Sequence, residues 1–173
     1  TINAAKSEIP PASATPVSLV AREILQYAST IDEAYNIAKQ RKMFVAESFL
    51  IGSAKDHRAA IIEKSPDAID LYEEHDGDII STNHFQGKLL GETELNRAHI
   101  ASSASPYRYA RVEELLRENG KNSVIKTSQI LRDQKGLNGI PIGMGNEKSI
   151  NQLIAHHGII FQPEKGLVWI SSA

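Results

Sequence analysis

Apolar residues recur at helical spacing near the start of the chain. The residues that share this apolar face are Val20, Ala21, Ile24, Leu25 and Ala28. Their spacing predicts an amphipathic helix over residues 16–28, with Thr15 as its N-cap and Pro16 at the first helical position. The proline-rich residues 7–14 before it predict a connector, because proline cannot continue a central strand.

A second helix is predicted over residues 31–41. Thr30 and Glu33 have the spacing of a capping box, in which each side chain satisfies a backbone N–H of the other. The apolar face expected to be buried consists of Ile31, Ala34, Tyr35 and Ala38. Two consecutive amphipathic helices therefore open the chain.

The pattern then changes to runs of apolar and β-favouring residues. Residues 43–53 and 59–64 are two such runs, and the polar stretch 55–57 between them predicts a turn, so we expect an antiparallel hairpin. A short strand over residues 69–72 and another over residues 78–82 are expected to continue this sheet.

Helical signals return after residue 104. Ser105 as N-cap, Pro106 at the first position and Gly120 past the end predict a helix over residues 106–119. A further short helix is predicted over residues 128–133.

The last forty residues predict a loop and a second hairpin. Glycines make residues 134–148 an irregular loop. Residues 150–161 and 167–171 are then predicted as antiparallel strands joined by a turn at residues 163–166.

This order of elements favours the α+β class, because helices and antiparallel strands are segregated. We expect one domain over residues 1–173, with an antiparallel sheet and the helices 16–28, 31–41 and 106–119 packed on one face. The other sheet face would be left for a missing element to cover.

Composition and charge limit the partners and the compartment. A net charge of −2 without a long basic run argues against nucleic acid. Without an apolar stretch near the roughly 20 residues that span a bilayer, we expect a soluble protein of unknown compartment, cytoplasmic or periplasmic. The count of zero cysteines excludes disulfides, thiolate zinc and a cysteine nucleophile within these residues.

Two polar groups are the best candidates for chemistry. Asn83 follows an apolar stretch, and Arg108 and Arg111 lie in the first turns of a predicted helix. An amide donor and a fixed cation are what a site needs to hold an oxyanion or an anionic group. No residue capable of covalent attack has an obvious base beside it, which indicates half of an active site.

These residues are part of a wider resemblance. The chain resembles the acyl-coenzyme A:6-aminopenicillanate acyltransferase family of N-terminal-nucleophile hydrolases, and choloylglycine hydrolases and penicillin V acylases are similar at a greater distance. The segments that carry the resemblance are Thr1-Ile2-Asn3-Ala4, the helix pair 16–41, the hairpin 49–63, Thr82-Asn83-His84-Phe85, the Ser105-x-x-Arg108-x-x-Arg111 helix and the hairpin 159–171.

The resemblance implies a four-layer αββα sandwich and a cysteine that self-processing exposes at a new N-terminus. That cysteine lies upstream of the region resembled here, so the chain is expected to be the C-terminal part of such an enzyme. The opening at Thr1 without an initiator Met agrees with a break just upstream. The expected partners are an acyl amide or acyl thioester substrate and either the missing N-terminal portion or a second copy.

The resemblance also implies roles for two residues. Asn83 corresponds to the asparagine that donates to the oxyanion, and Arg108 to the catalytic arginine near the nucleophile. The alternatives are a strand-end asparagine bonded to backbone and a solvated helix arginine. Arg111, three residues later on a similar face, is the second candidate for the arginine, and its alternative is an ordinary surface ion pair with Glu114. A nucleophilic Thr1 is a further alternative.

The function expected is that of a cysteine N-terminal-nucleophile amidase or acyltransferase, and Asn83 and Arg108 should then lie on the order of 10 Å apart, about one small-substrate width. The alternative is a catalytically inert α+β interaction or dimerisation domain.

His84 is predicted to be structural, and His156 and His157 to point apart in a strand, so no metal site is expected. No phosphate-loop motif occurs in residues 136–145, so no cofactor is expected either.

Overall fold

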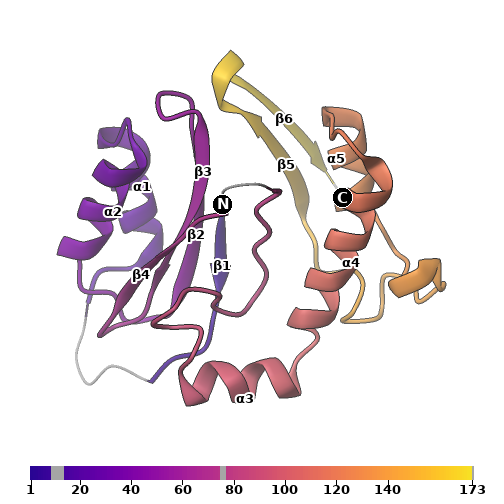
Figure 1. Cartoon of the computed structure of the whole chain (residues 1–173), viewed down its shortest axis with the longest axis horizontal. Coiled ribbons are helices and arrows are strands. Elements are labelled where there is room, and N and C mark those ends of the chain that lie inside the picture. Colours follow the sequence, from indigo (N-terminus) through magenta and orange to yellow (C-terminus); the bar gives the residue numbers. More distant parts are fainter. Residues whose placement is uncertain (9–13, 75–76, 173) are drawn as a thin grey trace. The chain divides into compact units, whose positions relative to one another are not determined.

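The computed structural model describes residues 1–8, 14–74 and 77–172 of the chain (Figure 1). The chain consists of two compact units, Thr1–Ser103 and Ala104–Ala173. Helices and antiparallel strands occur in separate blocks, which confirms the α+β prediction. The predicted connector over residues 7–14 falls mostly on residues 9–13, which lie outside the described residues.

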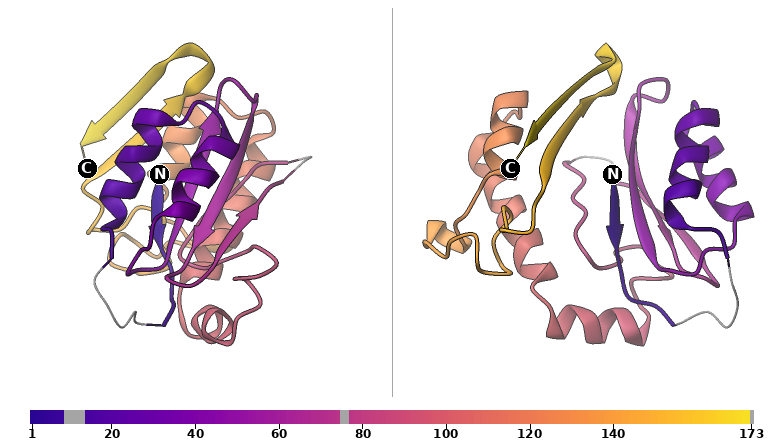
Figure 2. Two further views of the ribbon diagram at one scale, coloured as in Figure 1. Left: turned by 90° about the vertical axis from the view of Figure 1, so that its left-hand side faces the viewer. Right: turned by 180° about the vertical axis from the view of Figure 1, so that it is seen from behind.

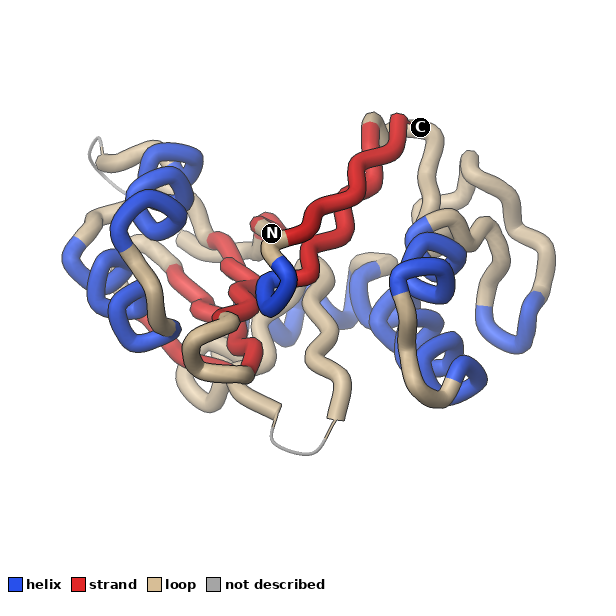
Figure 3. The backbone as a smooth tube through the Cα atoms, turned by 90° about the horizontal axis from the view of Figure 1, so that it is seen from above, coloured by secondary structure: helices blue, strands red, loops and turns tan. Residues whose placement is uncertain are grey.

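The first unit is built on a four-stranded antiparallel sheet in the order β1-β2-β3-β4, labelled in Figure 1. Strands are drawn in red in Figure 3. The strands are β1 (Ile2–Ala4), β2 (Glu47–Ser53), β3 (Arg58–Lys64) and β4 (Ile69–Tyr72). The predicted hairpin is confirmed, because β2 pairs antiparallel with β3 and a turn connects them, although β2 begins at Glu47 rather than at residue 43. The strand predicted at residues 69–72 is also confirmed as β4.

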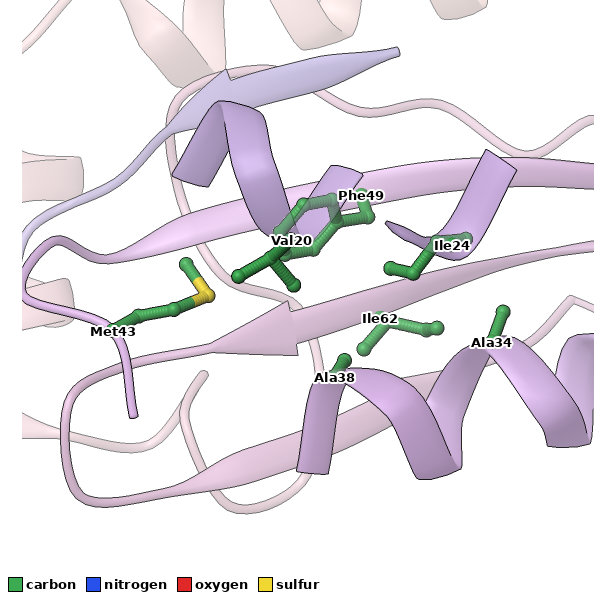
Figure 4. Packing of buried hydrophobic residues seen from close by; sticks show 7 residues of the cluster. All are labelled: Val20, Ile24, Ala34, Ala38, Met43, Phe49 and Ile62. Atoms are coloured by element: carbon green, nitrogen blue, oxygen red, sulfur yellow. The ribbon is translucent and has the colours of Figure 1, made fainter. Parts of the chain in front are cut away.

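Two helices, α1 (Val17–Tyr27) and α2 (Ile31–Gln40), cover one face of this sheet (Figure 2, left). Their apolar stripes meet the sheet in the core shown in Figure 4, whose buried members are Val20, Ile24, Ala34, Ala38, Met43, Phe49 and Ile62. Phe49 and Ile62 lie opposite each other in the β2–β3 register, so alternate strand residues supply the sheet side of this core. Truncating a residue such as Phe49 to alanine would cost about 3–5 kcal/mol.

The helix starts differ in how closely they follow the predictions. The capping box of α2 is confirmed, with Thr30 Oγ1 accepting from Glu33 N at 3.1 Å and Glu33 accepting from Thr30 N at 3.2 Å. The prediction that Thr15 caps α1 is wrong. Pro16 holds the cap position without a side-chain bond, because Thr15 forms a parallel bridge with Met43 instead.

The prediction of a strand over residues 78–82 is wrong. This stretch is extended but joins no ladder, because side chains satisfy its carbonyls. Asn3 Nδ2 donates to Ser81 O at 3.2 Å, and Gln86 Nε2 donates to Ile80 O at 2.8 Å. Ile2 pairs with the core residue Phe49 and so shares its face, and Asn3 points to the other face. The stretch therefore lies over the sheet face opposite α1 and α2.

The first unit ends in a helix that the sequence analysis did not predict, α3 (Glu94–Ser102). Thr93 caps it by accepting from the backbone N–H of Asn96 at 3.4 Å.

The second unit contains α4 (Ser105–Asn119), α5 (Val124–Leu131) and the antiparallel hairpin β5 (His157–Gln162) and β6 (Leu167–Ser172). Short 3₁₀ helices cover Leu137–Gly139 and Pro163–Lys165. The second hairpin is therefore confirmed. The packing of α4 against the four-stranded sheet stays a prediction.

Three predicted boundaries in the second unit are wrong. Ala104 rather than Ser105 is the N-cap of α4, and Ser105 is its first residue. The short helix begins earlier than residue 128, because Ser123 caps it by accepting from Lys126 N at 3.3 Å. The strand predicted from residue 150 starts only at His157, so His156 lies outside β5. Gly120 does end α4, at a φ of 59°.

Candidate functional site

Asn83 lies at a bend in the extended stretch that crosses the second sheet face. Its Nδ2 donates to the carbonyl of Ala4, the last residue of β1, at 3.0 Å. This bond fits the structural alternative for Asn83, and it also fixes the plane of the amide, so the role of Asn83 stays a prediction. The neighbouring His84 is buried, and its Nδ1 lies 3.1 Å from Thr82 Oγ1, as expected of a structural histidine.

Two carboxylates beneath the residues that follow Asn83 accept backbone N–H groups. Glu63 Oε1 accepts from Gln86 N at 2.6 Å, and Glu63 Oε2 accepts from Gly87 N at 2.8 Å. Asp70 Oδ2 accepts from Leu89 N at 2.6 Å. We call Glu63 and Asp70 the carboxylate pair; the sequence analysis did not single out either residue.

Asn96 of α3 holds the same stretch from another side. Its Oδ1 accepts from Phe85 N at 2.9 Å, and its Nδ2 donates to Phe85 O at 3.0 Å and to Gly91 O at 2.9 Å. Asn96 is fully buried, so these three bonds satisfy an amide that could not reach water. Residues 85–91 are thereby held at both ends.

The electrostatics of the carboxylate pair are unusual. Glu63 is fully buried, and this burial raises the pKa of its carboxyl above the ordinary value. The N–H groups of Gln86 and Gly87 lower the pKa, and the negative charge of Asp70 raises it again. A sequence signal existed, since Glu63 ends an apolar run in a strand, but nothing in the sequence shows which N–H groups it reaches.

Arg108 lies in the first turns of α4, as predicted, and is half-buried. Its Nη1 donates to the carbonyl of Glu147 at 2.7 Å. Burial lowers the pKa of Arg108 from its ordinary value, and the carboxylate of Glu147 raises it in part. Beside it, the ammonium of Lys148 lies 5.0 Å from the centre of the Tyr107 ring, a cation–π contact.

Arg111 is not the surface residue that its alternative described. It does pair with Glu114, at 2.9 Å, but it is only 3% exposed. Its Nε and Nη2 also bind both oxygens of Asp133, at 2.9 and 3.1 Å. This bidentate pair raises the pKa of Arg111 further and makes the residue part of the packing of α4.

Other features of the described residues do not point to a metal or to a site at Arg108. No three His, Asp or Glu side chains among them are grouped so as to hold a metal ion. A cavity of about 530 Å³ lies within the second unit between α5 and the hairpin. Its walls include Leu131, Ile160 and Trp169, but not Arg108. None of the described helices has the length and apolar character needed to cross a membrane.

The comparison with protein families identifies the chain. The family model described as acyl-coenzyme A:6-aminopenicillanic acid acyl-transferase matches residues 1–172. The chain belongs to this acyltransferase family. No curated protein and no solved structure shows a significant match to the chain.

Membership of the acyltransferase family confirms the resemblance seen in the sequence and indicates acyltransferase- or amidase-like chemistry. The matched range covers both units, and so includes both Asn83 and Arg108. Asn83 lies in the first unit and Arg108 in the second, and the expected convergence of their side chains stays a prediction.

Proposed function

We propose that this chain is the C-terminal part of a cysteine N-terminal-nucleophile amidase or acyltransferase that acts on a linear amide or thioester. The match of the acyltransferase family over residues 1–172 carries this proposal. The αββα sandwich and a nucleophilic cysteine upstream of Thr1 are parts of the same proposal.

In the proposed reaction the cysteine sulfur attacks the acyl carbon, with the cysteine's own α-amine as the base that takes the thiol proton. The carbonyl oxygen becomes an oxyanion, and collapse of the tetrahedral intermediate breaks the bond to nitrogen or sulfur. The leaving group departs with that proton, and the thioester left on the enzyme then passes the acyl group to water or to a second amine.

Asn83 is proposed to donate a hydrogen bond from its amide to the oxyanion. A neutral donor stabilises developing charge without a proton transfer, provided that it is oriented beforehand. The bond from Asn83 to Ala4 and the bonds that hold residues 85–91 supply such orientation. Arg108 is proposed to orient the substrate or stabilise charge, because a guanidinium binds an acyl oxygen or a carboxylate and lowers the pKa of a nearby thiol.

We predict that Asn83→Ala, in the whole gene product, lowers turnover roughly 10²–10³-fold, the loss typical of one oxyanion donor. Turnover of acyl amides and acyl thioesters would be measured by release of the amine or thiol. Asn36→Ala is the matched control, because Asn36 is an exposed asparagine on α2. Equal turnover in both variants would leave Asn83 as a residue that only binds backbone.

Processing of the gene product tests the other half of the proposal. Mass spectrometry of the purified protein should find a fragment that begins with a cysteine upstream of Thr1. If no such cysteine is encoded, the cysteine mechanism is wrong.

One observation favours the alternative of an inert interaction or dimerisation domain. Among the described residues of the second unit, several large apolar side chains of the hairpin are exposed, namely Phe161, Leu167, Val168 and Ile170. A protein that dimerises in light scattering, lacks the processed fragment and turns over no acyl substrate would support this second function. A processed, active protein would exclude it.

A further inference from the structure

The carboxylate pair lies on the sheet face that α1 and α2 do not cover. Glu63 in β3 and Asp70 in β4 are direct partners in the antiparallel register. Their neighbours Ile62 and Leu71 face the helices, so by strand alternation both carboxylates point to the other face. Residues 80–90 lie over that same face, as the bonds from Asn3 and to Glu63 show.

The pair takes the place of ordinary backbone pairing for the stretch after Asn83. Four N–H groups donate to it, from Gln86 and Gly87 to Glu63 and from Leu89 and Leu90 to Asp70. Hydrogen bonds to an ionised acceptor are roughly twice as strong as neutral ones. The stretch is therefore held by charge rather than by a sheet ladder.

The contact is close enough to require glycine at position 87. A Cβ added to Gly87 would lie 2.3 Å from Asp70 Oδ2 and 2.9 Å from Glu63 Oε2. Both distances are shorter than atoms tolerate, so the backbone at residue 87 sits directly against the two carboxylates.

Such an arrangement is unfavourable for folding alone. Two carboxylates on neighbouring strands repel each other, and Glu63 is fully removed from water. A costly polar cluster next to a candidate site residue suggests that it serves the site.

The connection to Asn83 is short and stiff. Only His84 and Phe85 separate Asn83 from Gln86, and both are buried. Phe85 packs with Ala46 and Leu90, and Asn96 binds its N–H and its carbonyl. A shift of residues 86–87 is therefore passed to Asn83 rather than absorbed between them.

We propose that Glu63 and Asp70 are positioning residues that set the orientation of the Asn83 amide through the backbone of residues 86–90. This inference rests on the proposed function, in which Asn83 holds the oxyanion. Neither carboxylate touches the substrate.

Acid should loosen this arrangement. Protonation of Glu63 turns one acceptor oxygen into a hydroxyl, so one of the two N–H bonds weakens. The groups around Glu63 are Ser48, opposite it in β2, and Asp70, opposite it in β4. Residues 80–90, which lie over the same sheet face, also carry Lys88, which is exposed, and His84, which is buried. The acid limb of the turnover profile should therefore contain a contribution from Glu63.

The first experiment is Glu63→Gln in the whole gene product. The variant should lower kcat about 10- to 100-fold, the effect of a misplaced catalytic group, with KM little changed, and should lose the Glu63 contribution to the acid limb. Glu47→Gln is the matched control, because Glu47 is also a buried strand glutamate but shares the helix-covered face with Phe49. A folded Glu63→Gln protein with wild-type kcat, or an equal loss in both variants, would overturn the inference.

A second pair of variants separates geometry from charge. Gly87→Ala keeps both carboxylates but forces them and the backbone of residue 87 apart, and it should lower kcat as Glu63→Gln does. Gly77→Ala is its control, because a Cβ there meets nothing closer than 3.8 Å. Unchanged kcat in a folded Gly87→Ala protein would contradict the positioning role.

An NMR measurement on the wild-type protein needs neither activity nor a variant. As the pH falls, the protection factors of the Gln86 and Gly87 amides, which are corrected for the intrinsic fall of the exchange rate with pH, should decrease in the same titration that shifts the Asn83 side-chain NH₂ signals. Independent titrations would refute the coupling.

The variants separate this inference from the proposed function. If Asn83→Ala is inactive while Glu63→Gln and Gly87→Ala are not, the inference alone fails. If Asn83→Ala is fully active, the proposed function of Asn83 fails.

Discussion

At the residue scale, one buried arginine organises the second unit. Arg111 joins α4 to Asp133, which follows α5, through two hydrogen bonds. Its other partner, Glu114, also accepts from the N–H of Asn138 at 2.9 Å. The hydroxyl of Ser149 donates to the carbonyl of Asp133 at 3.3 Å. The segment that carries Glu147, the partner of Arg108, is therefore tied back to the same network.

We predict that Asp133→Ala destabilises the protein by roughly 3–5 kcal/mol, because it leaves the guanidinium of Arg111 buried without its bidentate partner. The free energy of unfolding would be measured by denaturant titration followed by circular dichroism. Glu113→Ala, which removes an exposed ion pair with Arg117, should leave stability nearly unchanged. A loss for Asp133→Ala no larger than for Glu113→Ala would show that the buried pair contributes little.

At the element scale, the start of α2 is defined twice over. The capping box of Thr30 and Glu33 satisfies its first N–H groups from within the helix. In addition, Asp56 from the β2–β3 turn accepts from Ile31 N at 2.7 Å. Both features place a negative or polar oxygen at the N-terminus of the helix, where the dipole favours it.

Thr30→Ala should therefore destabilise the protein by about 1 kcal/mol, the usual loss of an N-cap side chain. Urea titration is a suitable measurement, with Ser18→Ala on the exposed side of α1 as the control. If both variants unfold at the same urea concentration, Asp56 and the remaining contacts are sufficient to start α2 without the cap.

At the scale of the whole molecule, the two units bury charge in different ways. In the second, Arg111 is paired with carboxylates. In the first, burial alone raises the pKa of Glu47 and lowers the pKa of Lys64, which lie opposite each other in β2 and β3. Ionised buried groups of this kind oppose folding near neutral pH.

The pH dependence of stability should report this cost. Because the pKa of Glu47 is raised, its favourable contribution is complete below the ordinary value of about 4.3 and is lost as the pH rises through the raised value. Relative to wild type, Glu47→Gln should thus gain stability as the pH rises above the ordinary value and through the raised one. Thermal unfolding of both proteins across this range would test it, and a constant difference would contradict the raised pKa.

Features that depend on nearby residues were determined by the sequence itself. The hairpin of β2 and β3 follows from two apolar runs and a polar turn, and the start of α2 follows from Thr30 and Glu33, three residues apart. The family was also evident at this level, because its motifs occur in order along the chain. The apolar pattern of α1 predicted its length to within a residue at each end.

Only the tertiary structure decided which polar groups pair over long distances. Residues 78–82 have the apolar pattern of a strand, but side chains of Asn3 and Gln86 take their carbonyls, so no ladder forms. Glu63 meets its N–H partners 23 and 24 residues later, and Arg111 meets Asp133 22 residues later. The spacing of residues along the chain does not indicate such partners, because a buried polar group binds whichever donor or acceptor the tertiary packing places next to it.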